Sequence, residues 1–130
     1  MKSLIKSTAL AFAFTLLTLQ PAQAGKDIAQ DDKVALQLAL MEYVDGKTFD
    51  GRFLHFDAEK KELLGLYPAN LHPMIVPGTG FYFLCADFRD DQGGKVDVDF
   101  VATRTEGGFR VIQTMINNRA VVREIMKRNK

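Results

Sequence analysis

The segment that constrains the fold most is residues 81–104, in which apolar and polar side chains alternate along two stretches joined by a glycine-rich turn. Because successive side chains of a strand point to opposite faces of a sheet, this alternation predicts a pair of strands. The register between the two strands then decides which side chains share a face. If the connecting turn has an odd length, one face carries no charge and holds Tyr82, Leu84, Ala86, Phe88, Val96, Val98, Phe100 and Ala102.

The alternative register would mix carboxylates into both faces of the pair. Burying an unpaired carboxylate costs several kcal/mol, so we predict the register with one charge-free face and assign that face to the core. Gly93 or Gly94 can supply the positive φ angle that a short hairpin loop uses.

The opposite face of the strand pair is apolar at one end and acidic at the other. We predict that it binds a ligand or a partner through Phe81, Phe83, Cys85, Asp87, Asp97 and Asp99. Carboxylates that face each other on a sheet destabilise it, so solvent, a basic side chain, a metal or a cationic ligand must offset them. The internal candidates are basic residues near the C-terminal end: Arg119, Arg123, Lys127 and Arg128. Because asparagine would relieve this like-charge crowding, we expect Asp97→Asn and Asp99→Asn to be tolerated or even to stabilise the domain.

A helical pattern precedes the strands. Residues 33–44 are apolar over so wide a surface that we predict a helix buried on most sides. Asp31 or Asp32 can cap its first turn, and Gly46 can end it.

The residues that follow the helix alternate with a period of two. Residues 51–57 and 62–67 flank a short polar turn, which is typical of a hairpin. Residues 68–80 contain three prolines and two glycines, so we predict a loop or an edge crossing there.

The complete pattern predicts an α+β fold. Residues 109–117 add a further strand, and residues 118–130 form a short helix with many basic residues. A single antiparallel sheet of about five strands, packed on the N-terminal helix, satisfies this order. The order of elements resembles that of the cystatin-like and NTF2-like rolls, in which a curved sheet wraps a helix. The resemblance concerns element order alone and implies no functional residues.

The first 24 residues are typical of a secretory signal peptide. A basic start with Lys2 and Lys6 precedes an apolar run, and Ala22-Gln23-Ala24 is the small-x-small pattern of a cleavage site. The apolar run is shorter than the roughly 20 residues that span a bilayer. We therefore predict residues 1–24 as a cleaved signal peptide and residues 25–130 as one small domain without a transmembrane segment. The predicted location is the periplasm, and release to the medium stays open.

Charge and cysteine content limit the partners. Without the two lysines of the signal peptide, the 17 basic residues fall to 15 against 16 acidic ones, a net charge of −1. This balance argues against nucleic acid or anionic lipid as the main partner. Cys85 is the single cysteine, so it is buried, paired with another chain in a homodimer, metal-bound or reactive. Burial is the ordinary state of a free cysteine, and we predict it here.

Two kinds of chemistry compete with simple binding. His55, Asp57 and Cys85 could form a mixed site for zinc or copper, although the chain has none of the usual ligand spacings. Asp97 and Asp99 could divide acid and base roles in an isomerase or hydratase of the roll type, with Phe81, Phe83 and Met115 lining its pocket.

We predict a non-enzymatic binding or accessory module that needs no metal and no cofactor. The partner is a protein or a small molecule, and the predicted binding surface is the half-apolar, half-acidic sheet face. The enzyme with Asp97 and Asp99 and the weak metal-binding protein remain the alternatives.

Overall fold

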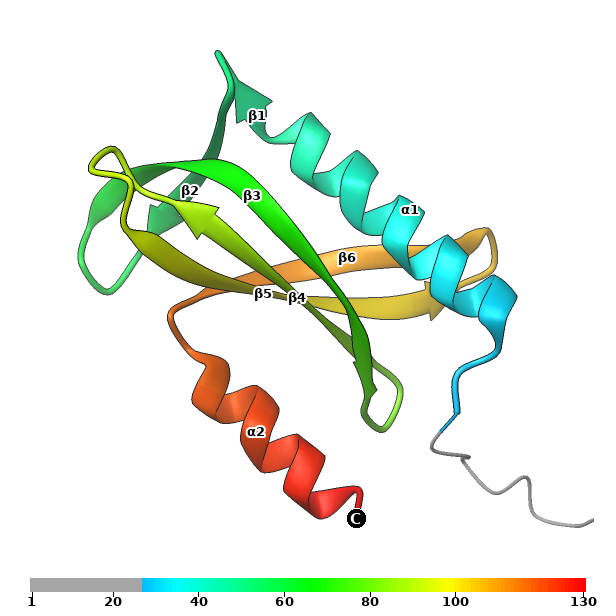
Figure 1. Ribbon diagram of the computed structural model, residues 1–130. Helices are drawn as coiled ribbons and strands as arrows, with labels where there is room; N and C mark the ends of the chain where they lie inside the picture. Colours follow the sequence, from blue (N-terminus) through cyan, green and yellow to red (C-terminus); the bar gives the residue numbers. More distant parts are fainter. Residues whose placement is uncertain (1–26) are drawn as a thin grey trace, which may run out of the picture.

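The computed structural model describes residues 27–130, so the predicted signal peptide at residues 1–24 lies outside the described residues. Figure 1 shows one sheet with a helix on each side. The elements in chain order are α1 (Gln30–Gly46), β1 (Thr48–Phe49), β2 (Arg52–Asp57), β3 (Glu62–Pro77), β4 (Tyr82–Arg89), β5 (Lys95–Thr105), β6 (Gly108–Ile116) and α2 (Arg119–Arg128). No helix among these residues has the length and apolar character needed to cross a membrane.

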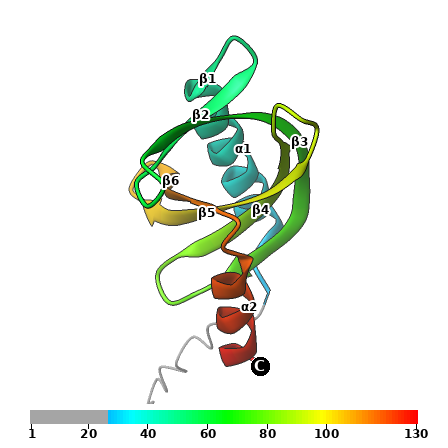
Figure 2. The ribbon, with the colours of Figure 1, turned by 90° about the vertical axis from the view of Figure 1, so that its left-hand side faces the viewer.

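The sheet is an antiparallel meander in the order β1-β2-β3-β4-β5-β6. Figure 2 shows that it curves around α1, while α2 extends from the other side. The predicted α+β class is therefore confirmed, with six strands in place of about five. The additional strand, β1, has only two residues and is too short to produce an alternating pattern.

The prediction of a loop or edge crossing at residues 68–80 was wrong for most of that segment. Residues 68–77 form the second half of β3, which pairs with β4 as far as Pro77. The pairing with β2 ends at Leu66, so this half of β3 has a neighbour on one side only. Proline is tolerated on such an edge and at bulges. Pro73 falls within the irregularity between Leu71 and Ile75.

The predicted register of β4 and β5 is confirmed. Leu84 pairs with Phe100 and Ala86 with Val98, and the connecting turn contains Gly93 at φ 77°. These side chains belong to the sheet face that packs on α1, which we call the α1 face. Its core contains Leu36, Leu40, Phe53, Leu66, Leu84, Ala86, Phe88, Val96, Val98, Phe100, Ala102 and Val111. The other sheet face, which packs on α2, is called the α2 face.

The expectation that α1 is buried on most sides was wrong. Leu36 and Leu40 are buried, but Leu38 and Met41 each remain 55% exposed. A helix on one face of a single sheet can bury only one stripe of side chains, and the opposite stripe stays in solvent. The cap was also misplaced, because α1 begins at Gln30 and no side chain of residues 27–130 caps it. Asp31 and Asp32 lie in its first turn, where the helix dipole favours carboxylates.

Candidate functional site

The structure brings the six predicted binding residues together on the α2 face. Asp87 pairs with Asp97, and Cys85 pairs with Asp99, across β4 and β5. Phe83 and Phe81 make an edge-to-face contact at 5.3 Å between ring centroids. The apolar part of this face is covered by α2, through a cluster that contains Val76, Phe81, Phe83, Cys85, Val101, Met115, Val122, Ile125 and Met126.

The acidic part of the same face is occupied by Arg119, the first residue of α2. Its Nη2 donates to Asp99 Oδ1 at 3.0 Å and to the carbonyl oxygen of Ala86 at 3.2 Å. Its Nη1 donates to Asp97 Oδ1 at 3.1 Å, and Asp99 is completely buried. Charged hydrogen bonds of this kind are roughly twice as strong as neutral ones. The basic side chain predicted to offset the carboxylates is therefore Arg119.

The buried contact between Arg119 and Asp99 reverses the expectation that Asp99→Asn is tolerated. That expectation treated Asp99 as an exposed carboxylate crowded by its neighbours. In the structure, Asp99 is the buried partner of an arginine, and breaking a buried pair leaves an uncompensated charge.

Asp87 completes the charged cluster and contacts His72, a residue that the sequence analysis placed in a loop. His72 Nε2 lies 3.2 Å from Asp87 Oδ2, and Lys95 Nζ lies 3.4 Å from Asp87 Oδ1. Burial alone would raise the pKa of Asp87, but the hydrogen bond and charge of His72, together with Lys95, lower it overall. The irregular pairing after Leu71 hides His72 from a simple alternating pattern.

Cys85 is buried, as predicted, and its chemistry is suppressed. Burial, a hydrogen bond with Asp99 and the charge of Asp99 raise the pKa of Cys85 to about 12. Only the thiolate is an effective nucleophile or metal ligand. The Cys85 thiol therefore has a structural role on this face at neutral pH.

The geometry offers little to the two chemical alternatives. Phe53 lies in the core of the α1 face, so the side chains of His55 and Asp57 share its side of β2, whereas Cys85 belongs to the α2 face. Within residues 27–130, no group of three or more His, Cys, Asp or Glu side chains is arranged to hold a metal. The space facing Asp97 and Asp99, where an enzyme would place its substrate, holds the guanidinium of Arg119.

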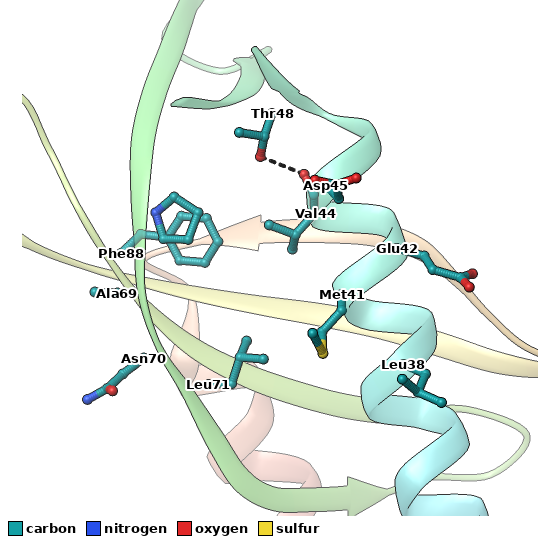
Figure 3. Close-up of a pocket in the computed structure, with 11 residues that line it drawn as sticks. Leu38, Met41, Glu42, Val44, Asp45, Thr48, Ala69, Asn70, Leu71 and Phe88 are labelled. Carbon is teal, nitrogen blue, oxygen red and sulfur yellow. Dashed lines mark hydrogen bonds between the residues drawn. The ribbon is translucent and has the colours of Figure 1, made fainter. Parts of the chain in front are cut away.

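An open groove lies on the opposite face of the sheet, beside α1. A groove of about 590 Å³ runs between α1 and the second half of β3 (Figure 3). It exists because α1 makes its contacts chiefly with β6, including a 3.0 Å hydrogen bond between the hydroxyls of Tyr43 and Thr114. The apolar residues that line the groove are Leu38, Met41, Val44, Pro68, Ala69, Leu71 and Phe88.

The walls and floor of the groove differ in burial. Phe88 is buried and forms the floor, as part of the core. Leu38 and Met41 on the helix wall are more than half exposed, and Leu71 on the β3 wall is 47% exposed. Figure 3 shows Met41 and Leu71 extending toward each other from the two walls. The groove thus presents apolar surface that the described part of the protein does not cover.

Polar groups are concentrated on the α1 side of the groove. Glu42 and Asp45 belong to the groove lining, and Thr48 at its upper end donates to the carbonyl oxygen of Val44 at 2.7 Å. Asn70 also lines the groove, but its side chain points away from it in Figure 3. Sequence reasoning missed this site because it placed the helix residues in a core and the β3 residues in a loop. The available signal was the width of the apolar surface of α1, which exceeds what one sheet face can cover.

The chain matches no protein-family model, no curated protein and no solved structure.

Proposed function

We propose that this protein is a small non-enzymatic binding module that holds an apolar ligand in the groove between α1 and β3. The observation that carries the proposal is the exposure of Leu38, Met41 and Leu71 around the buried ring of Phe88. Apolar patches that remain exposed in concave surroundings commonly mark binding sites. The α2 face, which the sequence favoured for binding, is covered by the chain's own α2.

The size of the groove suits a small molecule. Ligand sites typically enclose about 300–1,000 Å³ and combine an apolar lining with a few polar groups. The groove has this composition, with a volume of about 590 Å³. Its methionine adds adaptability, because the unbranched thioether of Met41 can adjust to ligands of different shape.

The chemistry of the groove favours binding over catalysis. Its titratable groups are Glu42 and Asp45, two exposed carboxylates at the rim that α1 forms. The strongly perturbed thiol of Cys85 and the paired carboxylates lie on the other side of the sheet. A ligand in the groove would therefore meet apolar side chains and a negative rim.

Two broader expectations accompany this proposal. The curvature of the sheet around α1 supports a roll of the cystatin-like or NTF2-like kind (Figure 2). The basic start, apolar run and Ala22-Gln23-Ala24 of the N-terminal segment support export by a cleaved signal peptide, with the protein acting in the periplasm or outside the cell.

The proposal can be tested with an uncharged apolar dye, Nile red, and matched serine variants. We expect Leu38→Ser and Met41→Ser to weaken dye binding about fivefold or more, since each removes apolar contact area. Both variants should keep their melting temperature, because both side chains are more than half exposed. Phe56→Ser is the control, since Phe56 is 60% exposed on the β2–β3 hairpin and does not line the groove. If Phe56→Ser weakens binding as much as the groove variants do, the groove is not the binding site.

A further inference from the structure

We infer that the ligand of this groove carries a positive charge at one end, as an alkylammonium compound does. The inference rests on the proposed function and adds the chemical class of the ligand. It follows from the distribution of charge around the groove.

In the part of the chain that the structure describes, the groove lining contains two carboxylates and no basic side chain. Glu42 and Asp45 are both exposed, and within residues 27–130 neither of them forms an ion pair. The acidic cluster on the α2 face contrasts with this arrangement, because Arg119 and Lys95 neutralise it internally. Both carboxylates of the groove are thus available to a cation that comes from outside, although Glu42 lies at the rim with its side chain extending away from β3 (Figure 3).

The end of α1 adds to the negative potential. Helix C-termini carry a partial negative charge that favours cations within the last turn. The last turn of α1 has no basic residue and instead contains Asp45. The nearest lysine in the sequence, Lys47, places its ammonium 4.8 Å from the centroid of the Tyr43 ring. Tyr43 is hydrogen-bonded to Thr114 on β6 and does not line the groove, so Lys47 is directed away from it.

The positions of these groups define how a ligand would lie. Asp45 and Thr48 are at one end of the groove, and Leu38 is at the other (Figure 3). A cationic head would lie beside Asp45 at the end of α1. The apolar body would extend along Met41 and Leu71 toward Leu38, over the ring of Phe88.

The test compares two ligands that share a tail and differ in the charge of the head group. Dodecylammonium and dodecanoate are titrated into the protein expressed from the full chain, each below its critical micelle concentration, with isothermal titration calorimetry at neutral pH and low salt. We expect dodecylammonium to bind about fivefold or more tightly than dodecanoate. The preference should shrink as salt is added, because exposed charges are screened.

Charge variants locate the effect. Asp45→Asn should weaken dodecylammonium binding about two- to fivefold, the range expected for one charge at a helix end. Glu42→Gln combined with Asp45→Asn should remove most of the preference between the two ligands. The control is Glu59→Gln, which removes an exposed carboxylate from the turn between β2 and β3 and should leave both affinities unchanged.

The outcomes separate this inference from the proposed function. If both ligands bind equally and Leu38→Ser weakens both, the groove binds apolar molecules but the inference of a cationic head is wrong. If dodecanoate binds more tightly, the inference is also wrong. If neither ligand responds to Leu38→Ser, the proposed function itself fails.

Discussion

The two faces of the sheet carry opposite arrangements of charge and apolar surface. On the α2 face, the carboxylates are paired with Arg119, and the apolar side chains are packed under α2. On the α1 face, the groove leaves Leu38 and Met41 in solvent beside two carboxylates that form no ion pair within residues 27–130. The carboxylates that stand out in the sequence therefore belong to a closed structural contact with Arg119. The open surface comes from α1, which has more apolar side chains than one sheet face can cover.

The reason lies in what each helix can cover. Arg119 begins α2, so one residue both neutralises the acidic end of the face and positions the helix over its apolar end. α1 contacts β6 chiefly and leaves the second half of β3 uncovered. Removing one partner of a buried ion pair strongly destabilises the fold, because the other charge stays buried without compensation. Changing an exposed leucine has little effect on stability.

The largest effect is expected from breaking the closed face. Arg119→Met should lower the free energy of unfolding by about 3–5 kcal/mol, because it leaves the buried carboxylate of Asp99 without its partner. Asp99→Asn should destabilise in the same direction. Arg123→Met is the control, since Arg123 is exposed on the same helix. Urea denaturation at neutral pH measures all three variants, and equal stability of the Arg119 and Arg123 variants would show that the face is not held by this pair.

A smaller effect is expected from pH at Asp87. Burial raises the pKa of Asp87, but His72 and Lys95 lower it by more, so the pKa is lowered in the folded protein. The ionised carboxylate therefore contributes stability above its ordinary pKa, and that contribution is lost as the pH falls through the ordinary value toward the lowered one. The stability difference between the unmodified protein and Asp87→Asn should shrink over this acidic range. Asp91→Asn, an exposed change in the adjacent turn, should show no such pH dependence.

The fold was largely predictable because its strongest pattern is local. The alternation in residues 81–104 fixed the register of β4 and β5, since only one register gives a charge-free face. The same pattern placed Asp97 and Asp99 beside Cys85, but it left Arg119 as one of four basic candidates, and the structure selects it. Alternation cannot report which of several arginines reaches a carboxylate, because that depends on where α2 begins.

The groove was not predictable by the same reasoning. The prolines in residues 68–77 favoured a loop. A strand accepts them there because β2 stops pairing with β3 at Leu66, which leaves the rest of β3 at the edge of the sheet. Leu38 is exposed because α1 packs mainly against β6, and this packing is tertiary structure that a local sequence pattern does not report. The pattern of α1 showed that apolar surface was in excess but not which side of the helix would remain open.

The most direct measurement uses the methionines as reporters of the two faces. Met41 lines the groove, whereas Met115 on β6 and Met126 on α2 pack in the cluster between α2 and the sheet. In a protein labelled with ¹³C at the methionine methyl groups, titration with dodecylammonium below its critical micelle concentration should shift the Met41 signal in a saturable manner. The signals of Met115 and Met126 should stay in place. Saturable shifts of Met115 and Met126 with an unchanged Met41 signal would contradict the account, because the ligand would then enter the α2 face.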